Sequence, residues 1–260
     1  MTAVTLMTDF GLRDHFVAAM KGVMLNITPE LTLTDITHEI PRGDIHSGAF
    51  TLGQCCFYFP SGTIHLAVVD PGVGSNRKAL AVEAGGHLFV AHDNGLLTHV
   101  FEARGDFTAY EITAEQYFLK PVSATFHGRD IFAPVAAWIS RGVPLSQLGP
   151  PLPEPIRLPF PKSQRYGDYR IQGSVLAVDH FGNLITNLKS SDLPRAFKIV
   201  AGERGIHTLR QTYADGAPGE IFVVAGSVGY LEIVMRDGSA AETLRLEVGA
   251  SVVLISLRKP

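Results

Sequence analysis

The stretch VTLMTDFGLRDHFVAAMKGVMLNI, residues 4–27, decides the fold of the first half of this chain. Val4 to Met7 is a short apolar run, as expected for a buried strand. After Asp14, apolar side chains recur at roughly helical spacing, so we expect a helix that Asp14 caps. The stretch therefore predicts a strand followed directly by an amphipathic helix.

The same alternation continues outward along the chain. Residues 31–36 alternate as a strand does, and residues 63–69 form another apolar run. Between them, Asp44 can cap a second helix that extends to about Tyr58. Strand, helix, strand, helix, strand predicts a mainly parallel, Rossmann-like α/β sheet with right-handed crossovers. Further strands are expected at 79–84, 87–91 and 107–112, and a further helix near 130–140.

The second half of the chain has a different pattern. Residues 144–161 hold seven of the sixteen prolines, and proline removes backbone donors and fixes φ, so we expect an extended linker. The predicted organisation is an α/β domain (1–150), a linker (151–167) and a β-rich domain (168–260). Helical periodicity is nearly absent after the linker, which predicts a small antiparallel all-β sandwich or barrel. Its short β-type runs are 169–178, 184–188, 197–201, 221–225, 229–235 and 251–257.

Composition excludes several classes of protein. The chain has 260 residues, 46% hydrophobic and 18% charged, with a net charge of −3 and no run of Lys and Arg, which disfavours nucleic-acid binding. Cys55 and Cys56 are adjacent and are the only cysteines, so a disulfide framework is not expected. No charged leader and no stretch of about 20 apolar residues is present, so we expect a soluble, cytoplasmic protein without a membrane span.

Four polar segments follow apolar runs and place an ionisable side chain next to glycine. In an open α/β sheet, ligands bind in the crevice beyond the carboxyl ends of the strands, so such residues can converge on one site. This arrangement predicts an enzyme. The segments are Met7–Gly11, Val69–Arg77, Phe126–Asp130 and Val178–Asn183.

Each segment in the first half has both a functional and a structural interpretation. Asp9 stands where a carboxylate often binds ribose hydroxyls, but it could equally cap a turn. Asp70 and Arg77 flank glycines that let the backbone approach a ligand, but they could also form an ion pair that staples the turn. His127 could exchange protons near neutral pH, although a lone histidine is more often structural.

The segment in the second half is also compatible with a turn. Phe181 would be a costly exposed aromatic there unless it stacks on a flat ligand. Asn183 offers both a donor and an acceptor, as adenine recognition requires.

A catalytic metal is not predicted, because the chain holds no His-Glu-x-x-His or His-x-His-x-Asp cluster. The scattered candidates for metal ligands are His38, His65, Asp70, His92, Asp93 and His127.

Together, these segments resemble the S-adenosyl-L-methionine (SAM) hydroxide adenosyltransferases, which are adenosyl-forming SAM hydrolases related to the fluorinases and chlorinases. The resemblance covers essentially the whole chain. Its motifs are Thr8-Asp9-Phe10-Gly11, Lys21-Gly22, Asp70-Pro-Gly-Val-Gly-Ser, Asp93-Asn94-Gly95, His127-Gly128-Arg129-Asp130, Phe181-Gly182-Asn183 and Gly229-Tyr230-Leu231-Glu232-Ile233.

The resemblance implies SAM as the substrate and no cofactor. Water or hydroxide attacks the 5′ carbon, methionine leaves and adenosine forms. The family's catalytic Asp, Arg and His fall on Asp70, Arg77 and His127. The halogenases resemble this chain but carry tyrosine at the position of Asp70 and a halide-binding serine at that of Gly128, which implies that the nucleophile here is water.

The resemblance also implies the substrate contacts and the assembly. The expected contacts are Asp9 to the ribose hydroxyls, Asp14 to a neighbouring polar edge, Asp179 to the methionine ammonium, Phe181 and Asn183 to adenine, Tyr213 to the face of the base, Ser227 to the carboxylate, and Met235 to the substrate. The expected assembly is a homotrimer with sites between subunits. The chain departs from the family pattern at Gly43 (a large aromatic in relatives), His92 (often proline) and Arg236 (commonly asparagine).

Two other functions remain open at this point. One is a metal-dependent hydrolase of another nucleoside substrate, which a chelator would inactivate. The other is a protein that binds SAM without turnover, although binding alone does not require a set such as Asp70, Arg77 and His127.

Overall fold

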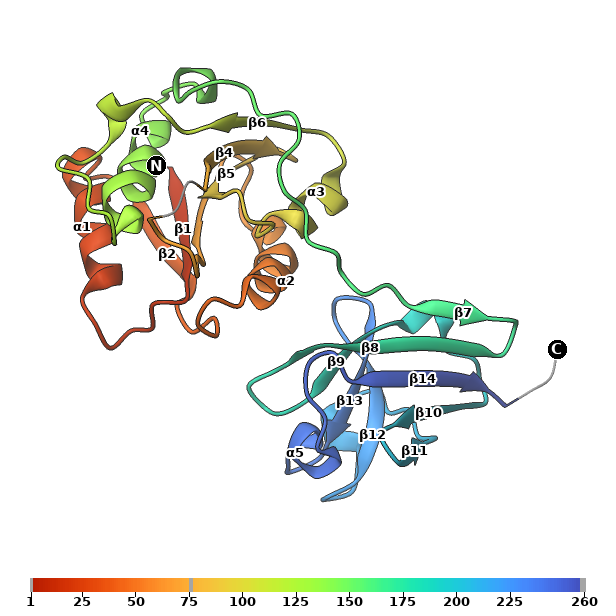
Figure 1. Cartoon of the computed structure of the whole chain (residues 1–260). Coiled ribbons are helices and arrows are strands. Elements are labelled where there is room, and N and C mark those ends of the chain that lie inside the picture. Colours follow the sequence, from red (N-terminus) through yellow and green to blue (C-terminus); the bar gives the residue numbers. More distant parts are fainter. Residues whose placement is uncertain (1, 75–76, 258–260) are drawn as a thin grey trace. The chain divides into compact units, whose positions relative to one another are not determined.

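The computed structural model describes residues 2–74 and 77–257. The chain forms two compact units that divide between Pro159 and Phe160, within the proline-rich segment. Each unit has its own hydrophobic core and is described by itself (Figure 1).

Over the described residues, the N-terminal unit contains a six-stranded sheet in the order β2-β1-β3-β5-β4-β6. β2, β1, β3 and β5 are parallel neighbours, whereas β4 is antiparallel to both β5 and β6. The prediction of a mainly parallel α/β sheet is confirmed. The strands are β1 (Ala3–Thr8), β2 (Thr32–Thr37), β3 (Ile64–Val68), β4 (Ala79–Ala84), β5 (His87–His92) and β6 (Phe107–Glu111).

A two-residue turn explains why β4 runs against its neighbours. Gly85 and Gly86 join β4 to β5 with φ of 58° and 78°, and Ala84 pairs with His87. Two successive positive φ values favour glycine and produce a tight hairpin between antiparallel strands.

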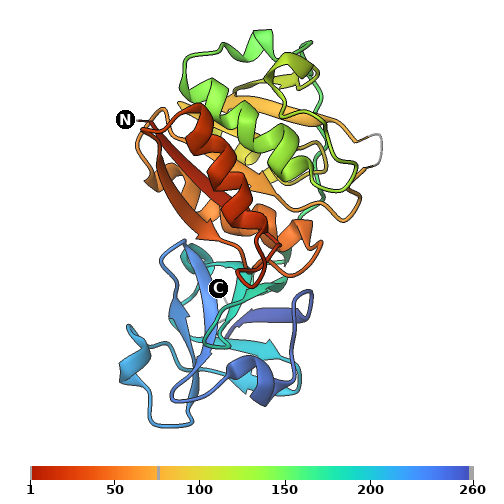
Figure 2. The same ribbon diagram turned by 90° about the vertical axis from the view of Figure 1, so that its left-hand side faces the viewer.

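Helices cover both faces of this sheet (Figure 1). α1 and α4 pack side by side on one face, as Figure 2 shows, and they enclose the core that includes Leu6, Met20 and Phe132. α2 and α3 contact each other on the opposite face, where Gly48 lies against Met7. The helices are α1 (Phe16–Ile27), α2 (Ile45–Cys55), α3 (Thr98–Arg104) and α4 (Ala133–Ser140).

The two predicted helix caps had different outcomes. Asp44 caps α2, because its Oδ1 accepts the Ser47 N–H at 3.0 Å, and a 3₁₀ turn extends the helix to Tyr58 as predicted. The prediction for Asp14 was wrong. α1 begins at Phe16, His15 precedes it without a side-chain cap, and Asp14 is exposed. The helix starts where the apolar spacing starts, two residues beyond the nearest good capping residue.

The C-terminal unit is a nearly closed antiparallel β-barrel, as predicted. Its strands follow the order β11-β10-β14-β8-β9-β13-β12, with β7 paired to β8. A short helix, α5 (Ala240–Leu244), was not predicted, because five residues are too few to show helical periodicity. The strands are β7 (Gln164–Tyr166), β8 (Arg170–Val178), β9 (Leu184–Lys189), β10 (Phe197–Ala201), β11 (Arg204–Ile206), β12 (Ile221–Ala225), β13 (Tyr230–Met235) and β14 (Ser251–Ser256).

The proline-rich segment is partly fastened to the N-terminal unit. The Ile156 N–H donates to Asp93 Oδ1 at 2.7 Å, and the Leu158 N–H donates to Thr98 Oγ1 at 2.9 Å. Ile156 and Leu158 therefore use their backbone donors on this unit.

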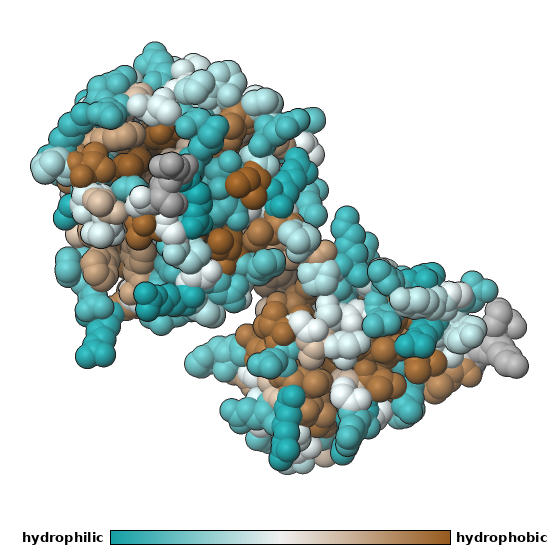
Figure 3. Space-filling view, in the orientation of Figure 1, coloured by the Kyte–Doolittle hydropathy of each residue, from teal (hydrophilic) through white to brown (hydrophobic). Residues whose placement is uncertain are grey.

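The surface carries both hydrophobic and hydrophilic side chains, and both cysteines are free. On the face shown in Figure 3, hydrophobic side chains lie among hydrophilic ones in both units. Within the described part of the chain, no helix has the length and apolar character needed to cross a membrane. Cys55 and Cys56 are free thiols, and burial raises their pKa values to about 11 and about 12, so they stay protonated near neutral pH.

Candidate active site

The first two predicted segments lie at neighbouring strand ends. β1 and β3 are adjacent and parallel, and Thr8 pairs with Val68 at their carboxyl ends. The chain places β2 on one side of β1 and β3 on the other, so the direction of strand order reverses at this point. Ligands of open α/β sheets bind at such a reversal. Asp9 and Asp70 follow these two strands.

Asp9 is held by the backbone of Gly43. Its Oδ2 accepts the backbone N–H of Gly43 at 2.8 Å. Gly43 has φ of +70°, and a Cβ added there would lie 3.0 Å from Pro71 Cβ. Gly43 therefore connects Asp9 to the turn that begins at Asp70.

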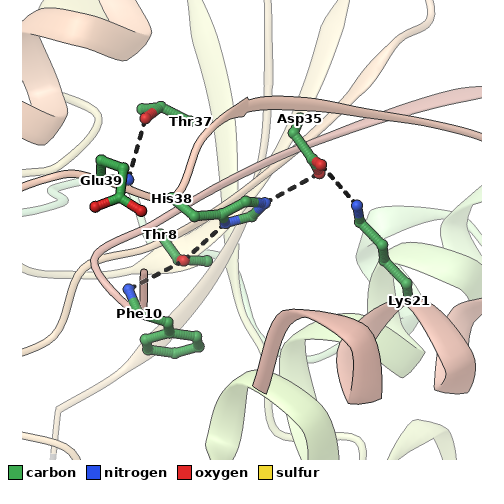
Figure 4. A network of polar contacts seen from close by, with 7 residues as sticks. All are labelled: Thr8, Phe10, Lys21, Asp35, Thr37, His38 and Glu39. Carbon is green, nitrogen blue, oxygen red and sulfur yellow. Dashed lines mark hydrogen bonds and ion pairs between the residues drawn. The ribbon is translucent and has the colours of Figure 1, made fainter. Parts of the chain in front are cut away.

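A polar network fastens the turn that carries Asp9 (Figure 4). His38 Nδ1 lies 2.8 Å from Thr8 Oγ1, and its Nε2 lies 3.0 Å from Asp35 Oδ1. Lys21, from α1, completes the network at 2.6 Å from Asp35 Oδ2. Burial alone would raise the pKa of Asp35, but the hydrogen bonds from Lys21 and His38 lower it. His38 and the Lys21 of the Lys-Gly motif are therefore positioning groups for this turn.

The Asp70 carboxylate is buried and paired. Its Oδ1 lies 2.9 Å from Arg77 Nη1 and accepts the Gly72 N–H at 3.0 Å. The Arg77 side chain packs over Gly72, in the space that a Cβ there would occupy. The pair both staples the turn and presents a buried carboxylate beside a guanidinium. Ser75 and Asn76, within the same motif, lie outside the described residues.

His127 immediately precedes a π-helical turn (Gly128–Phe132) that leads into α4. Such turns occur frequently at functional sites. Buried Asp130 secures the turn, because its Oδ2 accepts the Ser123 N–H at 2.8 Å and its Oδ1 pairs with Arg129 Nε at 2.6 Å. Arg129 and Asp130 therefore act structurally in this unit.

His92 joins these residues in one place. Its Nε2 lies 3.1 Å from Asp70 Oδ2, and burial lowers its pKa to about 4. Asp70 opposes that shift, whereas His127 and Arg77 add to it, so all three lie within electrostatic range of His92. Asp70 thus contacts both Arg77 and His92, and His127 lies within electrostatic range of His92.

A pocket of about 780 Å³ in the C-terminal unit collects most of the other predicted residues. Ser227 is not among its lining residues, because it lies exposed between β12 and β13. The pocket is lined by the predicted residues Asp179, Phe181, Asn183, Tyr213 and Met235, together with Ala214, Arg236, Asp237 and Gly238.

Asp179 organises one wall of this pocket. Its Oδ1 accepts the backbone N–H groups of Phe181 and Asn183, each at 2.9 Å, and its Oδ2 accepts the Asn183 side-chain amide at 2.9 Å. This tight turn leaves the Phe181 ring 74% exposed. An exposed aromatic face beside an amide and a carboxylate is suited to a flat, hydrogen-bonding ligand.

Two further residues, Glu232 and Arg236, support the part of the pocket formed by Tyr213 and Ala214. Tyr213 donates its hydroxyl to Glu232 Oε2 at 2.8 Å, and its pKa is raised to about 12 by burial and by Glu232. Arg236 donates to the carbonyls of Ala214 and Gly216, each at 2.7 Å. Glu232 could have been recognised from the sequence, because it is a carboxylate within the otherwise apolar run of β13.

The remaining candidates for metal ligands are engaged elsewhere. His65 Nδ1 lies 2.7 Å from Thr5 Oγ1, and its Nε2 lies 3.1 Å from His87 Nδ1. Across residues 2–74 and 77–257, no group of three or more His, Cys, Asp or Glu is arranged to hold a metal ion.

Comparison with known proteins gives one consistent result. Residues 4–149 match the SAM hydroxide adenosyltransferase N-terminal domain, and residues 173–253 match the corresponding C-terminal domain. The chain is 43% identical over 253 residues to the (R)-S-adenosyl-L-methionine hydrolase of Salinispora tropica, covering 95% of each chain. It is 28% identical over 289 residues to a fluorinase of Actinoplanes sp., covering 96% of each.

A solved structure of an uncharacterized conserved protein from Thermotoga maritima is also similar. It superposes with a TM-score of 0.90 at 34% identity and covers 97% of this chain and 99% of the other. The fold, the clustered residues and the matches over both units agree. The chain belongs to the SAM hydroxide adenosyltransferase family.

Proposed function

We propose that this protein hydrolyses SAM to adenosine and L-methionine by attack of water on the ribose 5′ carbon. The observation that carries the proposal is the buried Asp70 carboxylate paired with Arg77 and in contact with His92, which in turn lies within electrostatic range of His127. It occurs in a chain that is 43% identical, over 95% of both lengths, to a protein named (R)-S-adenosyl-L-methionine hydrolase.

The main requirement of this reaction is a nucleophile held in the correct position. The sulfonium is an excellent leaving group, so the barrier lies in presenting a desolvated water in line with the C–S bond. The water oxygen bonds to the 5′ carbon, and the sulfur leaves with the electron pair of the broken bond as neutral methionine. We assign the released proton to His127. Arg77 remains protonated and stabilises the developing hydroxide, while Asp70 holds Arg77 and the water.

The surroundings of Gly128 favour water over halide. A Cβ added at this position would lie 3.2 Å from Met20 Sδ and 3.3 Å from the Phe10 ring. The serine that halogenases are expected to carry here would therefore need its neighbours to move.

We assign the substrate contacts by the same reasoning. Asp9, near Asp70, and the neighbouring Asp14 take the ribose side of SAM. In the C-terminal pocket, Asp179 takes the methionine ammonium, and Phe181 and Asn183 take adenine. Tyr213 and Met235 complete this pocket. Ser227, in the turn between β12 and β13, binds the carboxylate of the methionine part of SAM.

We further propose a homotrimer in which each site combines the N-terminal unit of one subunit with the C-terminal unit of another. The candidate residues fall in two separate units, and the aromatic rings of Phe181 and Tyr213 are 74% and 53% exposed. Exposed aromatic surface beside a pocket is typical of a face that a ligand or a second subunit covers.

Mixed oligomers test the shared site. We expect His127→Ala and Asn183→Ala chains, each nearly inactive, to recover activity when co-expressed, because about a quarter of the sites in a random ring combine two unmutated halves. The matched control mixes His127→Ala with Asp70→Ala, which lie in the same unit and should not recover. No recovery in the first mixture, with mixed oligomers verified by mass spectrometry, would place the whole site within one chain.

The proposed reaction is tested by incubating the purified protein with SAM in halide-free buffer and separating the products. We expect adenosine and methionine, with label from heavy-oxygen water in the adenosine 5′-hydroxyl. Binding without products would favour a SAM-binding protein. Loss of activity with EDTA would favour a metal-dependent hydrolase, and methylthioadenosine as the main product would contradict attack at the 5′ carbon.

A further inference from the structure

The two oxygens of the Asp70 carboxylate have different neighbours. Oδ1 is held by Arg77 and by the Gly72 N–H, whereas Oδ2 lies 3.1 Å from Nε2 of His92, the last residue of β5. The side chains of Asp70 and His92 are only 3% and 4% exposed. Solvent therefore competes little for this contact.

His92 is held in place mainly by packing. Its ring meets the Phe132 ring edge-on, with 4.4 Å between centroids. In the described part of the chain, neither of its ring nitrogens nor Asp70 Oδ2 has a well-aligned hydrogen-bond partner. Polar contacts in an active site without substrate are often poorly aligned and tighten in the complex. Asp70 Oδ2 and the Lys78 backbone carbonyl are thus the acceptors that act on the imidazole.

The His92 imidazole is neutral near pH 7. Burial lowers its pKa to about 4, and the opposing effects of the Asp70 carboxylate and the Lys78 carbonyl do not restore the ordinary value. A neutral imidazole carries a single N–H. Because a hydrogen bond to a carboxylate is roughly twice as strong as one to a neutral acceptor, that proton belongs on Nε2, facing Asp70.

We propose that His92 is a positioning residue, whose Nε2–H holds Asp70 Oδ2 and thereby keeps Oδ1 on Arg77 and the Gly72 amide. The inference rests on the proposed function of Asp70. With Oδ2 released, the carboxylate can rotate, and a displacement of about 1 Å near the reacting atoms can cost about 10²-fold in rate.

Steady-state kinetics of SAM hydrolysis test this role. His92→Leu removes the donor but keeps apolar bulk against Phe132, and we expect kcat to fall about 10- to 100-fold with KM within about twofold. His92→Gln keeps an N–H and should recover most of the lost rate. His87→Leu, at the other end of β5, controls for loss of a buried histidine and should keep the wild-type kcat. Wild-type kcat in His92→Leu, or no recovery in His92→Gln, would overturn the proposal.

Histidine nitrogen NMR of the free protein tests the contact without turnover. The His92 signals, assigned by their loss in His92→Gln, should show a neutral ring protonated on Nε2, and Asp70→Asn should shift the Nε2 resonance. A ring protonated on Nδ1, or insensitive to Asp70→Asn, would refute the contact. If the wild-type protein fails to hydrolyse SAM, the proposed function fails, and this measurement still decides the placement of His92.

Discussion

Acidification should destabilise the N-terminal unit through His65, which lies on β3 with a fully buried side chain. Burial, with a smaller effect of His87, lowers its pKa to about 3 from the ordinary value of 6.5. Because the pKa of His65 is lower in the folded than in the unfolded state, its contribution to the free energy of unfolding is complete above pH 6.5. This contribution is lost as pH falls from 6.5 toward 3. At about pH 5, roughly 1.5 units below the unfolded value, the loss is about 2 kcal/mol.

Urea denaturation of the full chain, followed by fluorescence, measures this loss. The single tryptophan, Trp138, lies in α4 and reports on the N-terminal unit alone. His65→Gln should reduce the difference in unfolding free energy between about pH 7.5 and about pH 5 by about 2 kcal/mol. His15→Gln, on an exposed side chain of the same unit, should leave that difference unchanged. If the unfolding free energy of His65→Gln changed between these two pH values as much as that of the wild-type protein, the reasoning would be refuted.

Three further predictions concern the site. Asp70→Ala should abolish turnover but leave SAM affinity within about tenfold, or about 1.4 kcal/mol, by calorimetry; loss of binding would reassign Asp70 to a substrate contact. Glu232→Gln should weaken the bond that holds Tyr213 and raise KM about tenfold at unchanged kcat, a pattern that a fall in kcat alone would contradict. Gly43→Ala should cost about 1–2 kcal/mol in urea denaturation, because φ is +70° there; wild-type stability would mean that the turn relaxes freely.

The fold could be predicted where local pattern and tertiary structure agree. Most strands of both units were found because apolar runs and apolar alternation are local signals, whereas β7 and β11, with three residues each, were too short to be predicted. The Asp14 cap failed because capping preference is weak beside the packing that starts α1 at Phe16. α5 was missed because its five residues, which follow the N-cap Ser239, are too few to show helical periodicity.

In the site, contacts within one turn could be predicted from the sequence, but contacts between distant segments could not. Asp70 and Arg77 share one turn, so their spacing alone suggested a pair. His92 reaches Asp70 across 22 residues, and Glu232 reaches Tyr213 across 19. Such contacts depend on the packing of strands and turns, which no short motif encodes.

The tight packing around Gly128 has an evolutionary consequence. A hydroxyl side chain at this position would require Met20 and Phe10 to shift by a few tenths of an ångström, because they lie 3.2 and 3.3 Å from a Cβ there. A mutational path from water toward another nucleophile is therefore ordered, with substitutions that open space coming first and the new side chain later. Gly128→Ser alone would meet these two side chains before any gain from new chemistry could be realised.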